Sequence, residues 1–161
     1  MVQLEMRWAE TEAERLWLEG LWQREWGGLT MITRGKSTAL ADLRAVIAYL
    51  DEEPVGAVTW LENEKDAELM SLNALREGLG IGSALLARAE QEVRATGKER
   101  LFLITTNDNL HALRFYQRRG YRLVRVYPGA VDAARLLKPS IPVIGYDQIP
   151  LHDELELAKE W

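Results

Sequence analysis

The sequence predicts an α/β domain whose sheet is mixed but mostly antiparallel, and three observations support this fold class. Several short segments alternate apolar and polar residues, which is the period of a half-buried strand. Other segments repeat apolar residues every three or four positions, as the buried face of a helix does. One apolar run leads through a glycine-rich loop into a helix and then into another apolar run, an order that predicts a crossover between two parallel strands.

The composition is that of a globular chain of 161 residues, and we expect a single domain over residues 1–161. The absence of cysteine excludes disulfide and thiolate chemistry, and the net charge of −5 argues against nucleic-acid binding. The first residues do not resemble a leader and no apolar run is as long as a membrane span, so we expect a soluble, cytoplasmic protein. His111 and His152 lie too far apart for a zinc signature, and we expect no metal.

The N-terminal half is expected to contain a strand, a helix and a hairpin. A capping box formed by Thr11 and Glu14 marks the start of the helix, and Gly27 marks its end. Residues 29–42, after the helix, are weakly patterned, and residues 35–38 within them are interpreted as a loop. In chain order, the expected strand, helix, loop and two hairpin strands occupy residues 2–8, 11–25, 35–38, 44–50 and 54–61.

The C-terminal half is expected to alternate strands and helices before an irregular tail. The expected strands are 68–73, 101–106, 121–127 and 152–159, and the expected helices are 83–96, 110–119 and 131–138. The strand 101–106 is apolar on both faces and is therefore placed in the centre of the sheet, whereas the last strand is expected to pair with 121–127. Residues 139–150 contain three prolines, and a long irregular connection of this kind is typical of a segment that lines a site.

Gly78, Gly80 and Gly82 lie between the strand 68–73 and the helix that follows it. The first amides of a helix have no internal partner, and glycines let a ligand approach them closely, so this order predicts an anion-binding loop. The alternative is a tight turn whose glycines serve packing only. The spacing fits neither the dinucleotide fingerprint, which would need glycine at Ser83 or Leu85, nor the P-loop, which would need lysine after its last glycine.

Two motifs resemble those of the GCN5-related N-acetyltransferases, in the right order and spacing. Glu77–Leu86 resembles the loop that binds the pyrophosphate of coenzyme A, and Asn109–Tyr121 resembles the second conserved block. The resemblance covers nearly the whole chain and is weakest over residues 9–42. Glu77 stands where the family usually has arginine or glutamine, so binding would rest on backbone amides. The tail motif Lys138–Pro142 resembles one found in functionally uncharacterised prokaryotic members.

The resemblance implies acetyl-coenzyme A as cosubstrate, held where the strands 68–73 and 101–106 splay apart between flanking helices. A main-chain amide at Met70 or Leu72 would polarise the thioester carbonyl. Arg118 or Arg119 could add positive charge. The expected coenzyme ligands are Met70, Leu72, Asn73, Ala74, Gly78, Leu79, Gly80, Ile81, Gly82, Ser83, Asn109, Ala112 and Tyr116. For Asn109, a plain helix cap is the alternative role.

The activity implied by the resemblance is transfer of acetyl to a primary amine by direct attack. Tyr116 is expected to be the acid that protonates the leaving thiolate, and Glu68 the base that deprotonates the amine, with Asp66 as the second candidate. The alternative function is a non-catalytic acyl-coenzyme A-binding or regulatory module on the same fold. The expected partners are acetyl-coenzyme A and an amine acceptor of unknown identity. A homodimer is left open, and neither nucleic acid nor membrane is expected.

Overall fold

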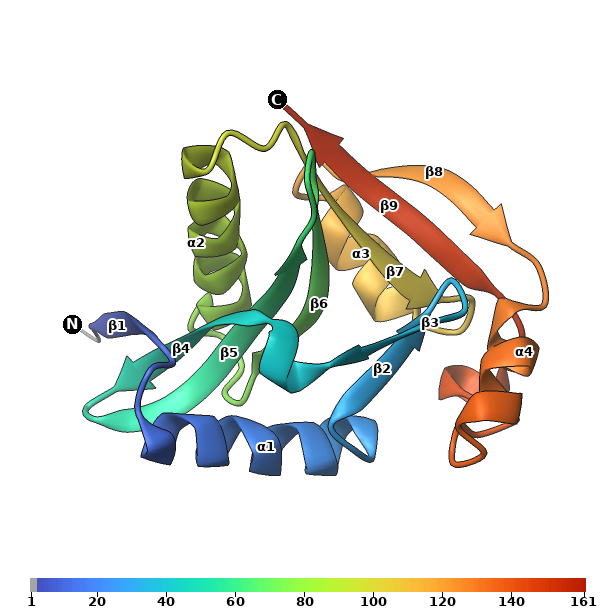
Figure 1. Cartoon of the computed structure of the whole chain (residues 1–161), viewed down its shortest axis with the longest axis horizontal. Coiled ribbons are helices and arrows are strands. Elements are labelled where there is room, and N and C mark those ends of the chain that lie inside the picture. The colour runs from blue at the N-terminus through green and yellow to red at the C-terminus, as the bar shows by residue number, and fades with distance from the viewer. Residues whose placement is uncertain (1–2) are drawn as a thin grey trace.

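Seven strands form one sheet in a computed structural model of the chain, which describes residues 3–161 (Figure 1). In spatial order they are β1 (Leu4–Trp8), β4 (Arg44–Leu50), β5 (Glu53–Glu62), β6 (Ala67–Ala74), β7 (Arg100–Thr106), β9 (Glu154–Glu160) and β8 (Arg122–Tyr127). Every neighbouring pair is antiparallel except β6 and β7, which are parallel. The predicted fold class is therefore confirmed, and β9 pairs with β8 as expected.

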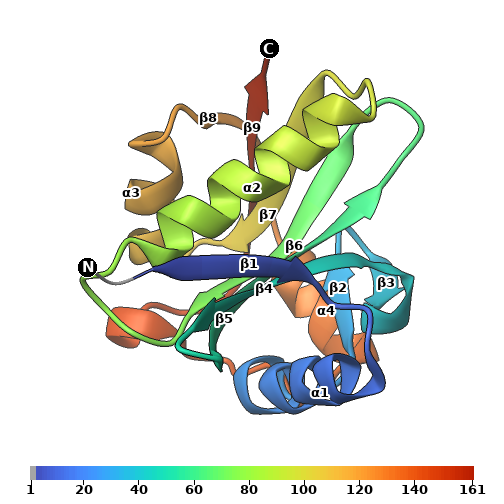
Figure 2. The same cartoon turned by 90° about the vertical axis from the view of Figure 1, so that its left-hand side faces the viewer.

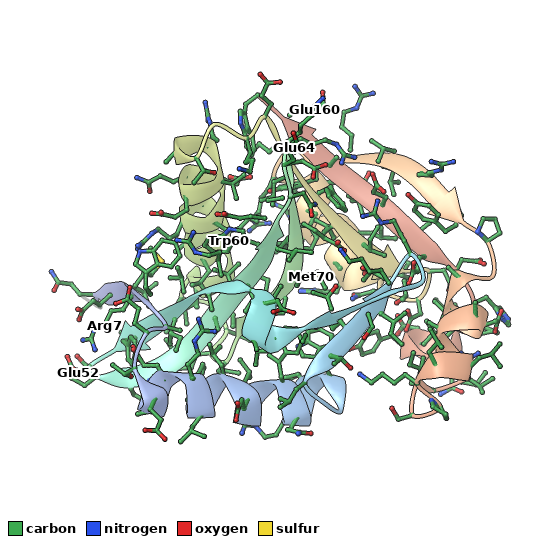
Figure 3. The ribbon with its side chains drawn as sticks, in the orientation of Figure 1. Arg7, Glu52, Trp60, Glu64, Met70 and Glu160 are labelled. Carbon is green, nitrogen blue, oxygen red and sulfur yellow. The ribbon has the colours of Figure 1, made fainter. Side chains whose placement is uncertain are left out.

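Helices cover both faces of this sheet (Figure 2). They are α1 (Glu12–Trp26), α2 (Ile81–Ala95), α3 (Leu110–Gln117) and α4 (Ala130–Leu137). The helix α2 packs on one face in a core that includes Trp60 and Leu69, and α1 packs on the other face in a core that includes Met70. Figure 3 labels Trp60 and Met70, one from each core. No helix within residues 3–161 is long and apolar enough to cross a bilayer.

The weakly patterned segment 29–42 contains a second small sheet, and the loop predicted at residues 35–38 was wrong because residues 36–38 belong to one of its strands. Strands β2 (Thr30–Thr33) and β3 (Lys36–Ala39) form a hairpin, followed by a short 3-10 turn, Leu40–Asp42. Arg34 and Gly35 connect the strands with φ values of 51° and 77°, as a two-residue hairpin turn of this hand requires. The strands are short and rich in polar residues, so their sequence carries little strand signal, and contacts with the main sheet hold them in place.

The parallel pair separates as the family resemblance implied. Ala67, Glu68 and Leu69 of β6 pair with residues of β7, but both strands continue beyond these pairs to Ala74 and Thr106. Just before this opening, Thr59 and Trp60 on β5 face Ser71 and Leu69 on β6, so Met70 is the extra residue of a β-bulge. Leu69 and Met70 belong to cores on opposite faces, as the alternation of side chains along a strand requires.

Candidate functional site

The loop after β6 ends at an open helix N-terminus. The helix α2 is capped by Gly80 with φ at 70°, and no side chain within residues 3–161 bonds to this end. Its first backbone bond runs from the Ala84 amide to the Gly80 carbonyl, at 3.0 Å, so the amides of Ile81, Gly82 and Ser83 precede the helical ladder. A Cβ built on Gly78 or Gly80 would meet no atom within 4 Å. The geometry is that of the predicted anion-binding loop, with its amides open to a ligand.

A cation lies beside this helix N-terminus. Arg119 donates hydrogen bonds from Nε and Nη2 to the Ser83 hydroxyl, at 3.1 and 2.6 Å, and its guanidinium stacks on the Phe115 ring at 3.7 Å from the centroid. Of the two arginines named from the sequence, the structure brings Arg119 to the loop. Glu77 is exposed to solvent, so its charge is screened but not removed.

Tyr116 lies on α3 and packs against two aromatic neighbours. Its ring makes edge contacts with Phe115 and Tyr121, at centroid distances of 5.0 and 5.6 Å, and the residue is 8% exposed. Burial raises the pKa of the Tyr116 phenol above its ordinary value, against a smaller opposing effect of Arg119. The phenol therefore keeps its proton at neutral pH. Asn109 begins this helix, and its Oδ1 accepts a hydrogen bond from the Ala112 amide at 3.1 Å, which fits the helix-cap alternative.

Glu68 lies in the last paired stretch of β6, immediately before the strands separate. Its Oε2 accepts a hydrogen bond from the Thr33 hydroxyl at 2.8 Å, and its side chain is only 4% exposed. Burial raises the pKa of the Glu68 carboxyl, and the Thr33 bond and the Arg34 charge oppose this effect. The structure thus covers Glu68 with the hairpin. Asp66 accepts hydrogen bonds from Asn63 and Arg100, at 2.9 and 3.3 Å, in the turn before β6.

The structure adds two buried acids that the sequence analysis did not single out. Glu154 and Glu156 on β9 are 3% and 6% exposed, because β7 and β8 flank the strand and the hairpin covers it. The Arg34 amide donates to Glu154 Oε1 at 2.8 Å, and the Arg34 Nη1 lies 3.8 Å from Glu156 Oε1. The alternation of these acids with Leu155 and Leu157 gave no signal of this burial, because the same pattern suits an exposed strand as well as one covered by another segment.

Two polar residues on the part of β6 that no longer pairs with β7, Ser71 and Asn73, differ in their partners. The hydroxyls of Ser71 and Thr59 are 2.6 Å apart and satisfy one another. Asn73, farther along β6, has a buried Oδ1 that finds no hydrogen-bond partner in the described chain. A buried amide oxygen normally has a partner, so Asn73 is suited to accept a hydrogen bond from a ligand.

The tail after α4 is fixed to two other loops. Lys138 donates from Nζ to the carbonyls of Trp26 and Thr30, at 2.8 and 3.1 Å, which joins α4 to the start of the hairpin. On the opposite side, Asn107 accepts hydrogen bonds from the amides of His152 and Asp153, both at 3.0 Å. The irregular residues 139–150 are therefore held beside both loops.

The separated parallel strands, the open helix N-terminus and the buried tyrosine together define an acyltransferase-like arrangement. The family model described as "Acetyltransferase (GNAT) family" matches residues 5–121. The chain therefore belongs to the GNAT acetyltransferase family.

The chain is also similar to a curated relative and to solved structures. The chain is 40% identical over 147 residues to the uncharacterised protein YxbD of Bacillus subtilis, covering 89% of this chain and 91% of that protein. Among solved structures, it resembles a Bacillus subtilis acetyltransferase in complex with CoA, with a TM-score of 0.73, 16% identity and 99% of each chain covered. It also resembles a GNAT family acetyltransferase from Elizabethkingia anophelis with acetyl-CoA bound, with a TM-score of 0.69, 18% identity and 99% and 98% of the two chains covered. At these identities, the structural likeness shows a shared fold.

Proposed function

We propose that this protein is an N-acetyltransferase that moves acetyl from acetyl-coenzyme A to a primary amine. The observation that carries the proposal is the open N-terminus of α2 beside the point where β6 and β7 separate. Membership of the GNAT family and the two coenzyme-bound structural neighbours support the same reading. A backbone-lined anion site next to a separated strand pair suits a ligand with a phosphate end and an extended arm.

The residues present fit the coenzyme. The amides from Leu79 to Ser83 would hold the pyrophosphate, and the free backbone edge of β6 near Leu72 and Ala74 would pair with the pantetheine arm. The partnerless Oδ1 of Asn73 would accept a hydrogen bond from an amide of that arm. Met70 or Leu72 would place a main-chain amide near the thioester carbonyl, and the bulge at Met70 frees backbone groups from the β5 pairing there. Ala112 and Asn109 remain proposed contacts at the start of α3.

The side chains supply the two proton transfers of a direct attack. Glu68 accepts the proton that the amine loses as its nitrogen bonds to the acetyl carbon. Tyr116 donates its proton to the sulfur as the carbon–sulfur bond breaks. Because the Glu68 side chain is only 4% exposed, we propose that its proton arrives through a water molecule. The bonds and charges balance without a covalent enzyme intermediate.

The test is calorimetry with acetyl-coenzyme A, followed by a thiol-release screen against a panel of primary amines. We expect saturable binding and release of free coenzyme with at least one amine. Binding without turnover across the panel would favour the non-catalytic acyl-coenzyme A-binding alternative. Failure to bind acetyl-coenzyme A at near-physiological salt would contradict both functions.

A further inference from the structure

The tip of the β2–β3 hairpin is the only part of residues 3–161 outside the main sheet that bonds to Glu68. The Thr33 hydroxyl donates a hydrogen bond to Glu68 Oε2 at 2.8 Å. Arg34, the next residue, places Nη2 3.8 Å from Glu68 Oε1 and Nη1 3.8 Å from Glu156 Oε1. Figure 1 shows the hairpin reaching from α1 towards β7 and β9, which brings these residues over the sheet.

We propose that Arg34 is a positioning residue: from the hairpin tip it supplies the positive charge that, with the Thr33 hydroxyl, holds the buried Glu68 as an ionised base. This inference rests on the proposed role of Glu68 as the base. A base must be ionised to accept a proton, and a carboxylate out of water needs a hydrogen bond or a nearby positive charge to remain so. The hairpin supplies both.

The electrostatic balance at Glu68 involves every element packed around it. Burial is the largest influence and favours the protonated acid, and Glu156 acts in the same direction. Thr33, Arg34 and Lys36 on the hairpin act in the opposite direction. The charged and titratable groups of this cluster, which we name the hairpin cluster, are Arg34 and Lys36 on the hairpin, Glu68 on β6, Arg100 on β7, Tyr127 on β8, and Glu154 and Glu156 on β9.

Arg34 is shared among the acids of this cluster and is not locked onto one of them. Its side chain is 38% exposed and lies 3.8 Å from two carboxylates, outside hydrogen-bond distance, while its guanidinium packs 4.7 Å from the Phe102 ring centroid. Glu156 has nearer partners in Arg100 and Tyr127. Within the described chain, Glu68 has no basic residue closer than Arg34, so removing this charge should affect Glu68 more than Glu156.

The variant that tests Arg34 must respect the backbone of the turn. Arg34 has a φ of 51°, a conformation that asparagine adopts more readily than most residues. Arg34→Asn therefore removes the charge while keeping the hairpin turn, and Arg34→Lys keeps a charge at the same place. Arg44→Asn is the matched control, because Arg44 forms an ion pair with Glu62 at 3.3 Å on an exposed part of the sheet.

The experiment is a pH titration of Glu68 itself. It is monitored by carbon NMR of the full chain, labelled at the glutamate carboxyl carbons. The Glu68→Gln variant identifies the Glu68 signal. We expect the Glu68 midpoint to move to higher pH in Arg34→Asn and in Thr33→Val, to return close to its wild-type value in Arg34→Lys, and to stay unchanged in Arg44→Asn. An unchanged midpoint in Arg34→Asn would overturn the proposal, whatever the Thr33→Val variant shows.

A second measurement separates this inference from the proposed function. In the thiol-release assay with an active amine, the acid limb of the pH–rate profile should move to higher pH in Arg34→Asn, in step with the titration. The NMR midpoint of Glu68 could shift in Arg34→Asn while the acid limb of the pH–rate profile does not. Such a result would show that the hairpin affects the titration of Glu68 but that Glu68 does not act in the catalytic step. It would thereby overturn the positioning role.

Discussion

The two halves of the candidate site differ in the groups that form them, which are mainly backbone groups in one half and side chains in the other. The half that would hold the pyrophosphate of the coenzyme consists of backbone amides and glycines from one continuous stretch, Gly78–Ser83. The half that would receive the acceptor consists of side chains from distant segments, since Thr33 bonds to a residue 35 positions away and Arg34 to one 120 positions away. A site made of local backbone leaves a pattern in the sequence, whereas a site assembled by long-range packing does not.

The largest expected effect tests whether the acceptor half carries chemistry. Glu68→Gln keeps the shape of the side chain and an oxygen that can accept the Thr33 hydrogen bond, but it removes the base. We expect turnover to fall by about 10²–10⁴-fold, with little change in acetyl-coenzyme A affinity. Thiol release and calorimetry on the same preparation measure both quantities.

Asp66→Asn is the matched control for Glu68→Gln, because it neutralises the second candidate acid two residues earlier. Asp66 lies in the turn before β6 and is paired with Asn63 and Arg100, so we expect turnover close to that of the wild type. A loss confined to Asp66→Asn would reverse the two assignments.

The next effect tests the acid at the junction of the two halves. Tyr116→Phe removes a hydroxyl that makes no hydrogen bond to residues 3–161, so the fold should not depend on it. We expect turnover to fall by about 10²-fold with every acceptor, while coenzyme affinity stays nearly unchanged. Tyr121→Phe, which loses a hydrogen bond to Glu90, serves as the control for removing a nearby phenol. Full activity in Tyr116→Phe would exclude this residue from proton transfer.

The same contrast explains what the sequence could predict. The strand that feeds the glycine loop, the crossover through α2 and the separation of β6 from β7 followed from periodicity, glycine spacing and the family resemblance. The hairpin at Arg34 and the burial of Glu154 and Glu156 did not. The hairpin strands are short and polar, and acids alternating with leucines suit an exposed strand as well as a covered one. Their burial depends on a third segment that arrives from far away in the chain.

A smaller effect tests the backbone half. Gly80→Ala places a methyl group at a φ of 70°, where alanine is strained by about 1–2 kcal/mol, and the new Cβ would meet only the ligand because no protein atom lies within 4 Å. We expect acetyl-coenzyme A affinity to fall about tenfold. Gly27→Ala is the matched control, with a φ of 72° and equally open surroundings at the end of α1. Gly27→Ala should lose a similar free energy of unfolding, measured by urea denaturation, and should leave the affinity for acetyl-coenzyme A unchanged.

The smallest expected effect concerns Glu77, the acid that departs from the family pattern at the loop. Replacing it with arginine removes a negative charge and adds a positive one beside open amides, and solvent screens both because the position is exposed. We expect Glu77→Arg to tighten acetyl-coenzyme A binding by about two- to fivefold at low salt, with the gain shrinking as salt is added. Glu64→Arg makes the same charge change in the turn before β6, labelled in Figure 3, and should leave affinity unchanged. Weaker binding in Glu77→Arg would mean that the glutamate supports the loop, and the pyrophosphate site would then also depend on a side chain.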